Sequence, residues 1–218
     1  MTKILGRGLA LGLLAGAILA AQDEPGIRVW LFDYTGLDTE TLAKAKLEAT
    51  EVLGKAGIRT SWLPCRVPSS TEPSPPVCGQ SLAENDVVLR IVTAAPARAD
   101  SSLGMAMVAK EGGMFATVYR SRVEELAKLR VAGLAQVLGH AMAHEIGHLL
   151  LGEGSHASSG IMKAWWERKD LENMNRGWLA FTARQADQAR ASVSGRSAAG
   201  RASVARATGS SGGNRHPR

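Results

Sequence analysis

The chain has 218 residues, a hydrophobic fraction of 45% and a mean hydropathy of −0.05, values of an ordinary soluble globular protein with one proper core. The formal net charge of +6 comes from the ends of the chain. Lys3, Arg7 and six arginines from Arg190 onward account for eight of the 26 basic residues, which leaves 18 basic against 20 acidic residues. This nearly neutral body argues against nucleic acid as a partner.

The N-terminus has the pattern of a secretory signal peptide over residues 1–21. Lys3 and Arg7 form a positive segment, and an apolar stretch rich in Ala, Leu and Gly runs from Leu9 to Leu19. Ala20-Ala21 offers a cleavage site before polar residues. The alternative is an uncleaved membrane anchor, but the run is short for a bilayer span of about 20 residues. We therefore expect a secreted or periplasmic protein, with no stable membrane insertion after signal cleavage.

The two cysteines, Cys65 and Cys78, flank a loop rich in proline and serine over residues 66–77. An exported protein meets an oxidising compartment, so we predict a disulfide that closes this loop. A reactive or metal-binding pair of thiols is the alternative, and it lacks the C-x-x-C spacing.

Strand and helix patterns alternate in the first half of the chain. Residues 27–34 are β-branched and aromatic, which is typical of a strand. A run with apolar residues at helical spacing follows, with Asp38 or Thr39 as its N-cap. Residues 58–63 and 86–92 indicate two more strands, one on each side of the cysteine loop.

A predicted pair of strands and a short helix come next. Residues 103–109 and 114–119 are extended segments that we expect to form a hairpin or an edge pair. Residues 121–129 form the predicted helix, in which Ser121 and Glu124 have the spacing of a capping box.

A longer helix is predicted from about residue 131 to 151, ending at Gly152. A last amphipathic run covers residues 176–193, and beyond it the chain is Ser, Ala, Gly and Arg with no large apolar residue. We therefore expect a catalytic domain over 22–193 and a disordered basic tail over 194–218. The element order indicates an α/β or α+β domain on a small mixed sheet, with a small C-terminal helical subdomain.

Residues 144–148 carry the most informative motif. They read His-Glu-Ile-Gly-His, the pattern H-E-x-x-H, inside the long predicted helix. His144 and His148 therefore lie on one helix face, where both can bind a single Zn²⁺ ion. Glu145 can then take a proton from a zinc-activated water as a general base. The alternative is a pair of core histidines with Glu145 at the surface, and His140, one turn earlier, is predicted to lie in the core or behind the ligands.

A catalytic zinc ion needs three protein ligands and one open position. We favour His156 as the third ligand, because Gly152 and Gly154 let the chain leave the helix and turn back. Glu167 and Glu172 are the alternatives, since a carboxylate also serves as a third zinc ligand.

The stretch 144–156 resembles the zinc-binding signature of the metzincin metallopeptidases, and Gly160-Ile161-Met162 resembles their Met-turn. The family pattern is H-E-x-x-H-x-x-G-x-x-H. Here the glycine comes one place later, and the third histidine follows His148 by eight residues instead of six.

The resemblance implies a zincin-like fold with zinc on His144, His148 and His156. It gives Glu145 the roles of general base and of proton shuttle to the leaving amine, and it makes Met162 an apolar floor under the metal. The implied function is a secreted zinc metalloendopeptidase that acts on a peptide or protein substrate. The alternatives are an exported zinc-binding protein of the same fold without proteolytic activity, and a membrane-anchored form of the enzyme.

Two further hypotheses concern the surroundings of the motif. The segment 114–119 could be an edge strand that pairs with an extended substrate, or a plain strand of the sheet. Trp165 and Trp166 could form a wall of a nearby pocket or serve only in packing. Nothing in the sequence indicates the oligomeric state.

Overall fold

The computed structural model of the chain describes residues 25–67, 73–97, 102–109 and 112–209. The predicted signal peptide, residues 1–21, lies outside the described residues. Within the described ranges, no helix combines the length and the apolar character that a transmembrane span requires.

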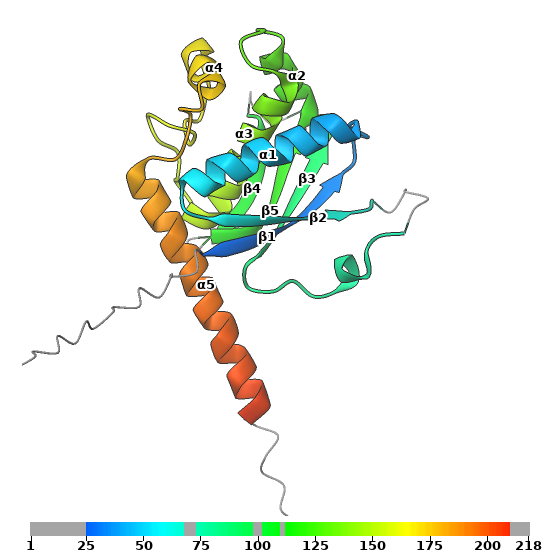
Figure 1. The fold of residues 1–218 in the computed structure, drawn as a ribbon, viewed down its shortest axis with the longest axis vertical. Helices are drawn as coiled ribbons and strands as arrows, with labels where there is room; N and C mark the ends of the chain where they lie inside the picture. Colours follow the sequence, from blue (N-terminus) through cyan, green and yellow to red (C-terminus); the bar gives the residue numbers. More distant parts are fainter. Residues whose placement is uncertain (1–24, 68–72, 98–101, 110–111, 210–218) are drawn as a thin grey trace, which may run out of the picture.

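A mixed sheet forms the centre of the fold, as the sequence predicts (Figure 1). Five strands make up this sheet in the described part of the chain, in the order β2-β1-β3-β5-β4. All neighbours pair in parallel except β4, which is antiparallel to β5. The strands are β1 (Gly26–Asp33), β2 (Arg59–Cys65), β3 (Asp86–Val92), β4 (Gly104–Ala109) and β5 (Gly112–Tyr119).

The predicted hairpin is confirmed, and of the two alternatives for residues 114–119 the plain sheet strand is correct and the edge strand is wrong. The segment 114–119 belongs to β5, which pairs with β3 on one side and with β4 on the other. Both sides of β5 are therefore used within the sheet. The edge strand next to β5 is β4, and no other described strand pairs with its outer side; β2 is the edge strand at the other end of the sheet.

Two long helices, α1 (Thr39–Lys55) and α3 (Leu134–Leu151), pack against each other on one face of the sheet (Figure 1). Their buried faces and the inward residues of the strands form the main hydrophobic core. The short α2 (Arg120–Ala127) connects β5 to α3. After α3 come α4 (Arg168–Asn175) and α5 (Ala183–Gly209), which correspond to the predicted C-terminal helical part.

One of the two predicted helix caps is present. Asp38 caps α1, because its side chain accepts a hydrogen bond from the Thr41 N–H at 2.8 Å. The prediction that Ser121 caps α2 is wrong, since α2 already begins at Arg120. β5 runs into α2 without a loop, and the Ser121 N–H donates to the carbonyl of Thr93 at 2.9 Å.

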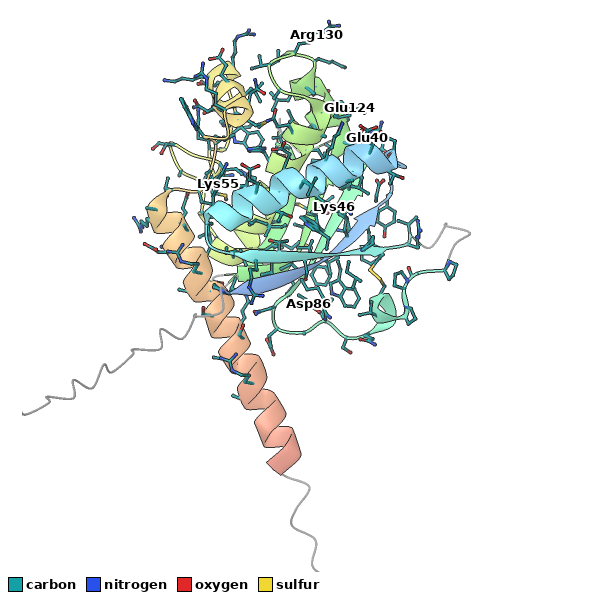
Figure 2. All side chains as sticks on the ribbon, viewed as in Figure 1. Glu40, Lys46, Lys55, Asp86, Glu124 and Arg130 are labelled. Atoms are coloured by element: carbon teal, nitrogen blue, oxygen red, sulfur yellow. A yellow bond between two sulfur atoms is a disulfide. The ribbon has the colours of Figure 1, made fainter. Side chains whose placement is uncertain are left out.

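The opposite face of the sheet carries a second, smaller core. Trp30, Val88 and Cys65 are buried there against partly buried residues of the cysteine loop. The predicted disulfide between Cys65 and Cys78 is present (Figure 2). It joins the end of β2 to a short 3₁₀ helix, η1 (Pro76–Gly79), and so ties the loop over this face.

The predicted disorder from residue 194 onward is wrong for 194–209, where α5 continues as helix. Alanine and arginine are strong helix formers, so this composition favours a helix even without a large apolar face. Arg196 donates to the carbonyls of Leu149 and Gly113, which fixes the middle of α5 to the body. Asn85 donates to Ser197, and Gly200 lies beside Glu84; after these contacts α5 extends away from the sheet (Figure 1). The part of the predicted tail after residue 209 lies outside the described residues.

Candidate metal centre

Helix α3 places the first two predicted ligands. It has no proline, and its interior residues are buried in the main core, so the H-E-x-x-H motif sits on a rigid element. His144 and His148 are one turn apart, and their Nε2 atoms lie 3.0 Å from each other. The helix ends at Gly152, whose positive φ of 81° turns the chain out of the helix.

The loop after α3 brings His156 back to this point. Gly154 also has a positive φ, 67°, which favours glycine in the turn. The ligand-type nitrogens of His144, His148 and His156 all lie within 4.8 Å of one another. Among the described residues, no other group of three or more His, Cys, Asp or Glu side chains converges this closely. The three histidines predicted as ligands therefore meet at one place.

Hydrogen bonds hold two of these rings with one nitrogen free for a metal. The Nδ1–H of His144 donates to the carbonyl of Ile161 at 2.7 Å. Nδ1 of His148 is hydrogen-bonded to the Oγ atom of Ser155 at 2.7 Å. The carbonyl can only accept, so it fixes the tautomer of His144, and both bonds hold the rings with Nε2 directed into the cluster. Ser155 lies in the lengthened loop, so the unusual spacing before His156 also supplies a partner for His148.

Burial keeps the imidazoles of His144 and His148 neutral, which is the form that binds metals. Desolvation lowers the pKa of His144 from 6.5 to about 4, and that of His148 to about 3. Neighbouring histidines lower both values further, and the carbonyl of Ile161 acts in the opposite direction on His144. The two rings are therefore neutral at neutral pH, as a zinc ligand must be.

Glu145 lies beside the cluster and not at the surface, so the surface alternative is wrong. Its side chain is only 2% exposed, and burial raises its pKa to about 8. Its Oε2 atom has no hydrogen-bond partner. β4 approaches it closely, because a Cβ atom on Gly104 would lie 2.6 Å from its Oε1 atom. Burying a carboxyl group without a hydrogen-bond partner costs stability, so such a group is a candidate for a functional role.

The segment that resembles a Met-turn passes under the cluster. Met162 is fully buried, and a Cβ atom on Gly147 would lie 2.7 Å from its Sδ atom. The backbone of this segment contributes the Ile161 carbonyl that holds His144. The alternative ligands do not join the cluster: Glu167 caps the start of α4, and the side chain of Glu172 is paired with Arg168.

Two aromatic neighbours complete the support behind the ligands. Trp166 donates from Nε1 to the Ile161 carbonyl at 3.1 Å, and its ring meets the ring of His144 edge to face. The predicted core position of His140 is confirmed, since it is 2% exposed and its Nδ1–H donates to the carbonyl of Gln136.

A cavity of about 870 Å³ opens over the cluster. Its walls come from the start of β4, from α2, from the loop after α3 and from residues 163–166. Met105, Leu129 and Trp165 line this cavity and are each about half exposed, so its rim is apolar. Trp165 therefore forms part of the cavity wall, while Trp166 mainly packs behind the ligands. Each of the two alternatives for the Trp pair holds for one residue.

Three contributors to the site did not emerge from the sequence. Ser155 stands next to His156, so its position near the ligands was visible, but a serine in a loop carries no distinctive pattern. Gly104 and Tyr119 both line the cavity and come from strand ends that are distant from the motif along the chain. Only the pairing of β4 with β5 above α3 brings these two to Glu145.

No family model matches the chain, and no curated protein matches it. Two solved structures resemble it over most of their own length. One is an archaemetzincin from Methanopyrus kandleri, with 16% identity, a TM-score of 0.48 and coverage of 78% of this chain and 97% of that chain. The other is a zinc-dependent peptidase from Methanocorpusculum labreanum (strain Z), with 17% identity, a TM-score of 0.49 and coverage of 74% and 99%. Both scores lie below 0.5, so we base the proposed function on the geometry of this chain.

Proposed function

We propose that the chain is an exported zinc metalloendopeptidase. Zinc binds to His144, His148 and His156, and Glu145 is the general base. One observation carries the proposal: three converging imidazoles lie beside a buried carboxyl group that has no hydrogen-bond partner, on the wall of an open cavity.

The side chains fit a catalytic zinc site. Such sites use three protein ligands and leave one position open for the reacting oxygen. Two of the ligand rings are neutral and held by outer hydrogen bonds, while the cavity side of the cluster is free of a fourth protein ligand among the described residues. When bound here, zinc would polarise a carbonyl group and lower the pKa of a water molecule.

Glu145 moves the proton in the proposed reaction. Its carboxylate takes a proton from the attacking water while the water oxygen bonds to the scissile carbonyl carbon. The carbon–nitrogen bond then breaks, and the same proton passes from Glu145 to the leaving amine. Burial raises the pKa of this carboxyl group to about 8 without metal, which strengthens it as a base, and the positive charge of bound zinc would favour the carboxylate form that the step requires.

The edge of β4 supports a polypeptide as the substrate. Residues Gly104, Met105 and Ala106 line the cavity from the end strand of the sheet. An extended peptide can add to such an edge through main-chain hydrogen bonds, which gives β4 the role first expected of residues 114–119. Pairing along a strand holds the chain on both sides of the cleaved bond, as an endopeptidase requires.

Export rests on the signal-like sequence of residues 1–21, and the disulfide supports it. Disulfides persist in oxidising compartments and are rare in reducing ones. The bond between Cys65 and Cys78 is therefore consistent with a secreted or periplasmic protein.

Metal content and peptide hydrolysis, measured together, test the proposal. Wild type is compared with His156→Ala, Glu145→Gln and, as a matched control, Glu153→Gln, which alters an exposed carboxylate on the same cavity. We expect about one zinc per chain in wild type and both Gln variants, and a loss or strong weakening in His156→Ala. Turnover of a mixed quenched-fluorescent peptide set should disappear in Glu145→Gln and persist in Glu153→Gln.

Three outcomes would contradict parts of this proposal. No zinc in wild type would overturn it entirely. Full zinc in His156→Ala would remove His156 from the ligand set. Zinc without hydrolysis in any protein would favour the alternative, an exported zinc-binding protein without proteolytic activity.

A further inference from the structure

We infer that Tyr119 is a further catalytic residue, whose hydroxyl donates a hydrogen bond to the scissile carbonyl oxygen as that oxygen becomes negatively charged. The inference rests on the proposed function and deepens it. It assigns the oxyanion-stabilising role to a side chain that lies outside the H-E-x-x-H motif and its loop.

The fold holds Tyr119 rigidly at the cavity wall. It is the last residue of β5, pairs with Val92 of β3 and caps α2. Its N–H donates to the Leu103 carbonyl at 2.8 Å, which ties it to the residue before β4. The side chain is only 3% exposed, yet it lines the same cavity as His144, Glu145 and His148.

The phenol hydroxyl of Tyr119 makes no hydrogen bond to a described residue. A buried tyrosine normally finds a hydrogen-bond partner for its O–H group. None of the described residues provides one for Tyr119, and the nearby Arg90 donates instead to Thr117 at 3.1 Å. Glu145 Oε2 also lacks a partner on this cavity. Glu145 thus offers a buried acceptor atom, and Tyr119 offers a hydroxyl without a hydrogen bond to a described residue, on the wall of the same cavity.

The electrostatic surroundings keep the phenol protonated. Burial raises the pKa of Tyr119 above its usual value of 10, and the charge of Glu145 raises it further, while Arg90 acts in the opposite direction. A neutral O–H donor held in position by the protein stabilises a developing oxyanion without the reorganisation that bulk water requires.

The proton count of the reaction is unchanged by this role. The water oxygen bonds to the carbonyl carbon, the π electron pair moves to the carbonyl oxygen, and the water proton goes to Glu145. The resulting oxyanion accepts a hydrogen bond from Tyr119 without taking its proton. When the carbon–nitrogen bond breaks, the oxygen regains its double bond, and the amine takes the proton from Glu145.

Tyr119→Phe tests the inference, because it removes the hydroxyl and keeps the buried ring. Loss of one oxyanion donor typically lowers kcat by about 100-fold to 1,000-fold. We expect a fall of that size with little change in KM, zinc content or Tm. Affinity for a phosphinic peptide, which carries a tetrahedral anion, should fall by a similar factor. The matched control is Tyr34→Phe, since Tyr34 is the other tyrosine and is 46% exposed.

A second measurement does not depend on turnover by the variant. In the Tyr34→Phe protein, Tyr119 is the only tyrosine left. Binding of the phosphinic peptide should then change the ultraviolet absorption of this phenol as it donates to the anion. An unchanged spectrum, unchanged kcat in Tyr119→Phe, or a change in KM alone would overturn the inference.

Failure of the inference and failure of the proposed function give different results. A wild-type protein that binds zinc but hydrolyses no peptide overturns both. An active wild type with an equally active Tyr119→Phe variant overturns only the role of Tyr119.

Discussion

Ser155 orients one of the three histidines, although it makes no contact with a metal itself. Its Oγ atom forms a 2.7 Å hydrogen bond with Nδ1 of His148. Removing such an outer partner typically weakens metal binding by about 10-fold to 100-fold. We therefore expect Ser155→Ala to raise the Kd for zinc by about that factor, measured by competition with a chelator. Ser158→Ala, an exposed serine of the same loop, is the control and should match wild type.

A side chain at position 104 would collide with the general base. A Cβ atom on Gly104 would lie 2.6 Å from Oε1 of Glu145 and 2.4 Å from the carbonyl oxygen of Thr117. The carbonyl is backbone and yields little, so the carboxyl group must shift. We predict that Gly104→Ala lowers kcat at least about 10-fold, because small displacements of reacting groups are costly. Zinc content should stay near that of wild type.

Gly54 provides the comparison for this prediction. It lies in α1, and a Cβ atom there would meet no other atom within 4 Å. Gly54→Ala should leave kcat unchanged and raise stability by about 0.5 to 1 kcal/mol, as expected for alanine in a helix. Equal kcat values for wild type and Gly104→Ala would contradict the close approach of β4 to Glu145.

At the scale of the secondary-structure elements, Arg196 connects α5, α3 and β5. Its guanidinium, on α5, donates to the carbonyl of Leu149 near the end of α3 and to the carbonyl of Gly113 in β5. Burial lowers the pKa of this arginine, yet it remains charged at any ordinary pH. A cation at a helix C-terminus is stabilising, because the last carbonyls carry partial negative charge.

Replacement of Arg196 should therefore loosen α5 from the active-site helix. Arg196→Met keeps an unbranched apolar stem and removes both hydrogen bonds. We expect a loss of about 1.5 to 3 kcal/mol in the free energy of unfolding, measured with urea, since hydrogen bonds to charged groups have that magnitude. Arg201→Met, at an exposed position farther along α5, should cost less than about 0.5 kcal/mol. Equal losses in the two variants would contradict the anchoring role.

Elements with a local signal were predictable from the sequence, and the relations between them were not. The i, i+4 histidines and the glycine-rich loop place three ligands within 13 residues, so local geometry alone brings them together. Strand order depends on long-range pairing, so the sequence alone does not distinguish β4 from β5 as the edge strand. The helix over 194–209 was missed for a similar reason, because its anchor at Arg196 is a tertiary contact.

At the scale of the whole molecule, the sheet separates the face that carries the metal cluster from the face that carries the disulfide. The metal cluster and Glu145 belong to the side of α3, while the disulfide and the small core around Trp30 lie on the other side. Cys65 and Cys78 are 13 residues apart, and closing a loop of that size stabilises by about 3 kcal/mol. The double variant Cys65→Ala, Cys78→Ala should lose about this much stability and keep its zinc content and kcat. A large loss of zinc would contradict the separation of the two faces.

The stability of the metal-free protein should fall in mild acid, and His140 is one cause. Burial lowers the pKa of His140 from 6.5 to about 4; the Gln136 carbonyl and Glu51 raise it, and Lys55 lowers it. Between these two values the unfolded chain binds a proton that the folded protein does not bind. This stabilising contribution is therefore complete above pH 6.5 and is lost as the pH falls toward about 4.

A substitution of His140 shows how much of the pH dependence of stability comes from this residue and how much comes from the other buried histidines. A shift of this size corresponds to about 3 kcal/mol, since one pKa unit is about 1.4 kcal/mol. Chelator-treated His140→Phe should be less stable than wild type at pH 7, where it lacks the hydrogen bond to Gln136, and its unfolding free energy should change less with pH. The measurement is urea unfolding at several values from pH 4 to 7. Parallel curves for the two proteins would show that His140 is not the buried neutral group that its surroundings imply.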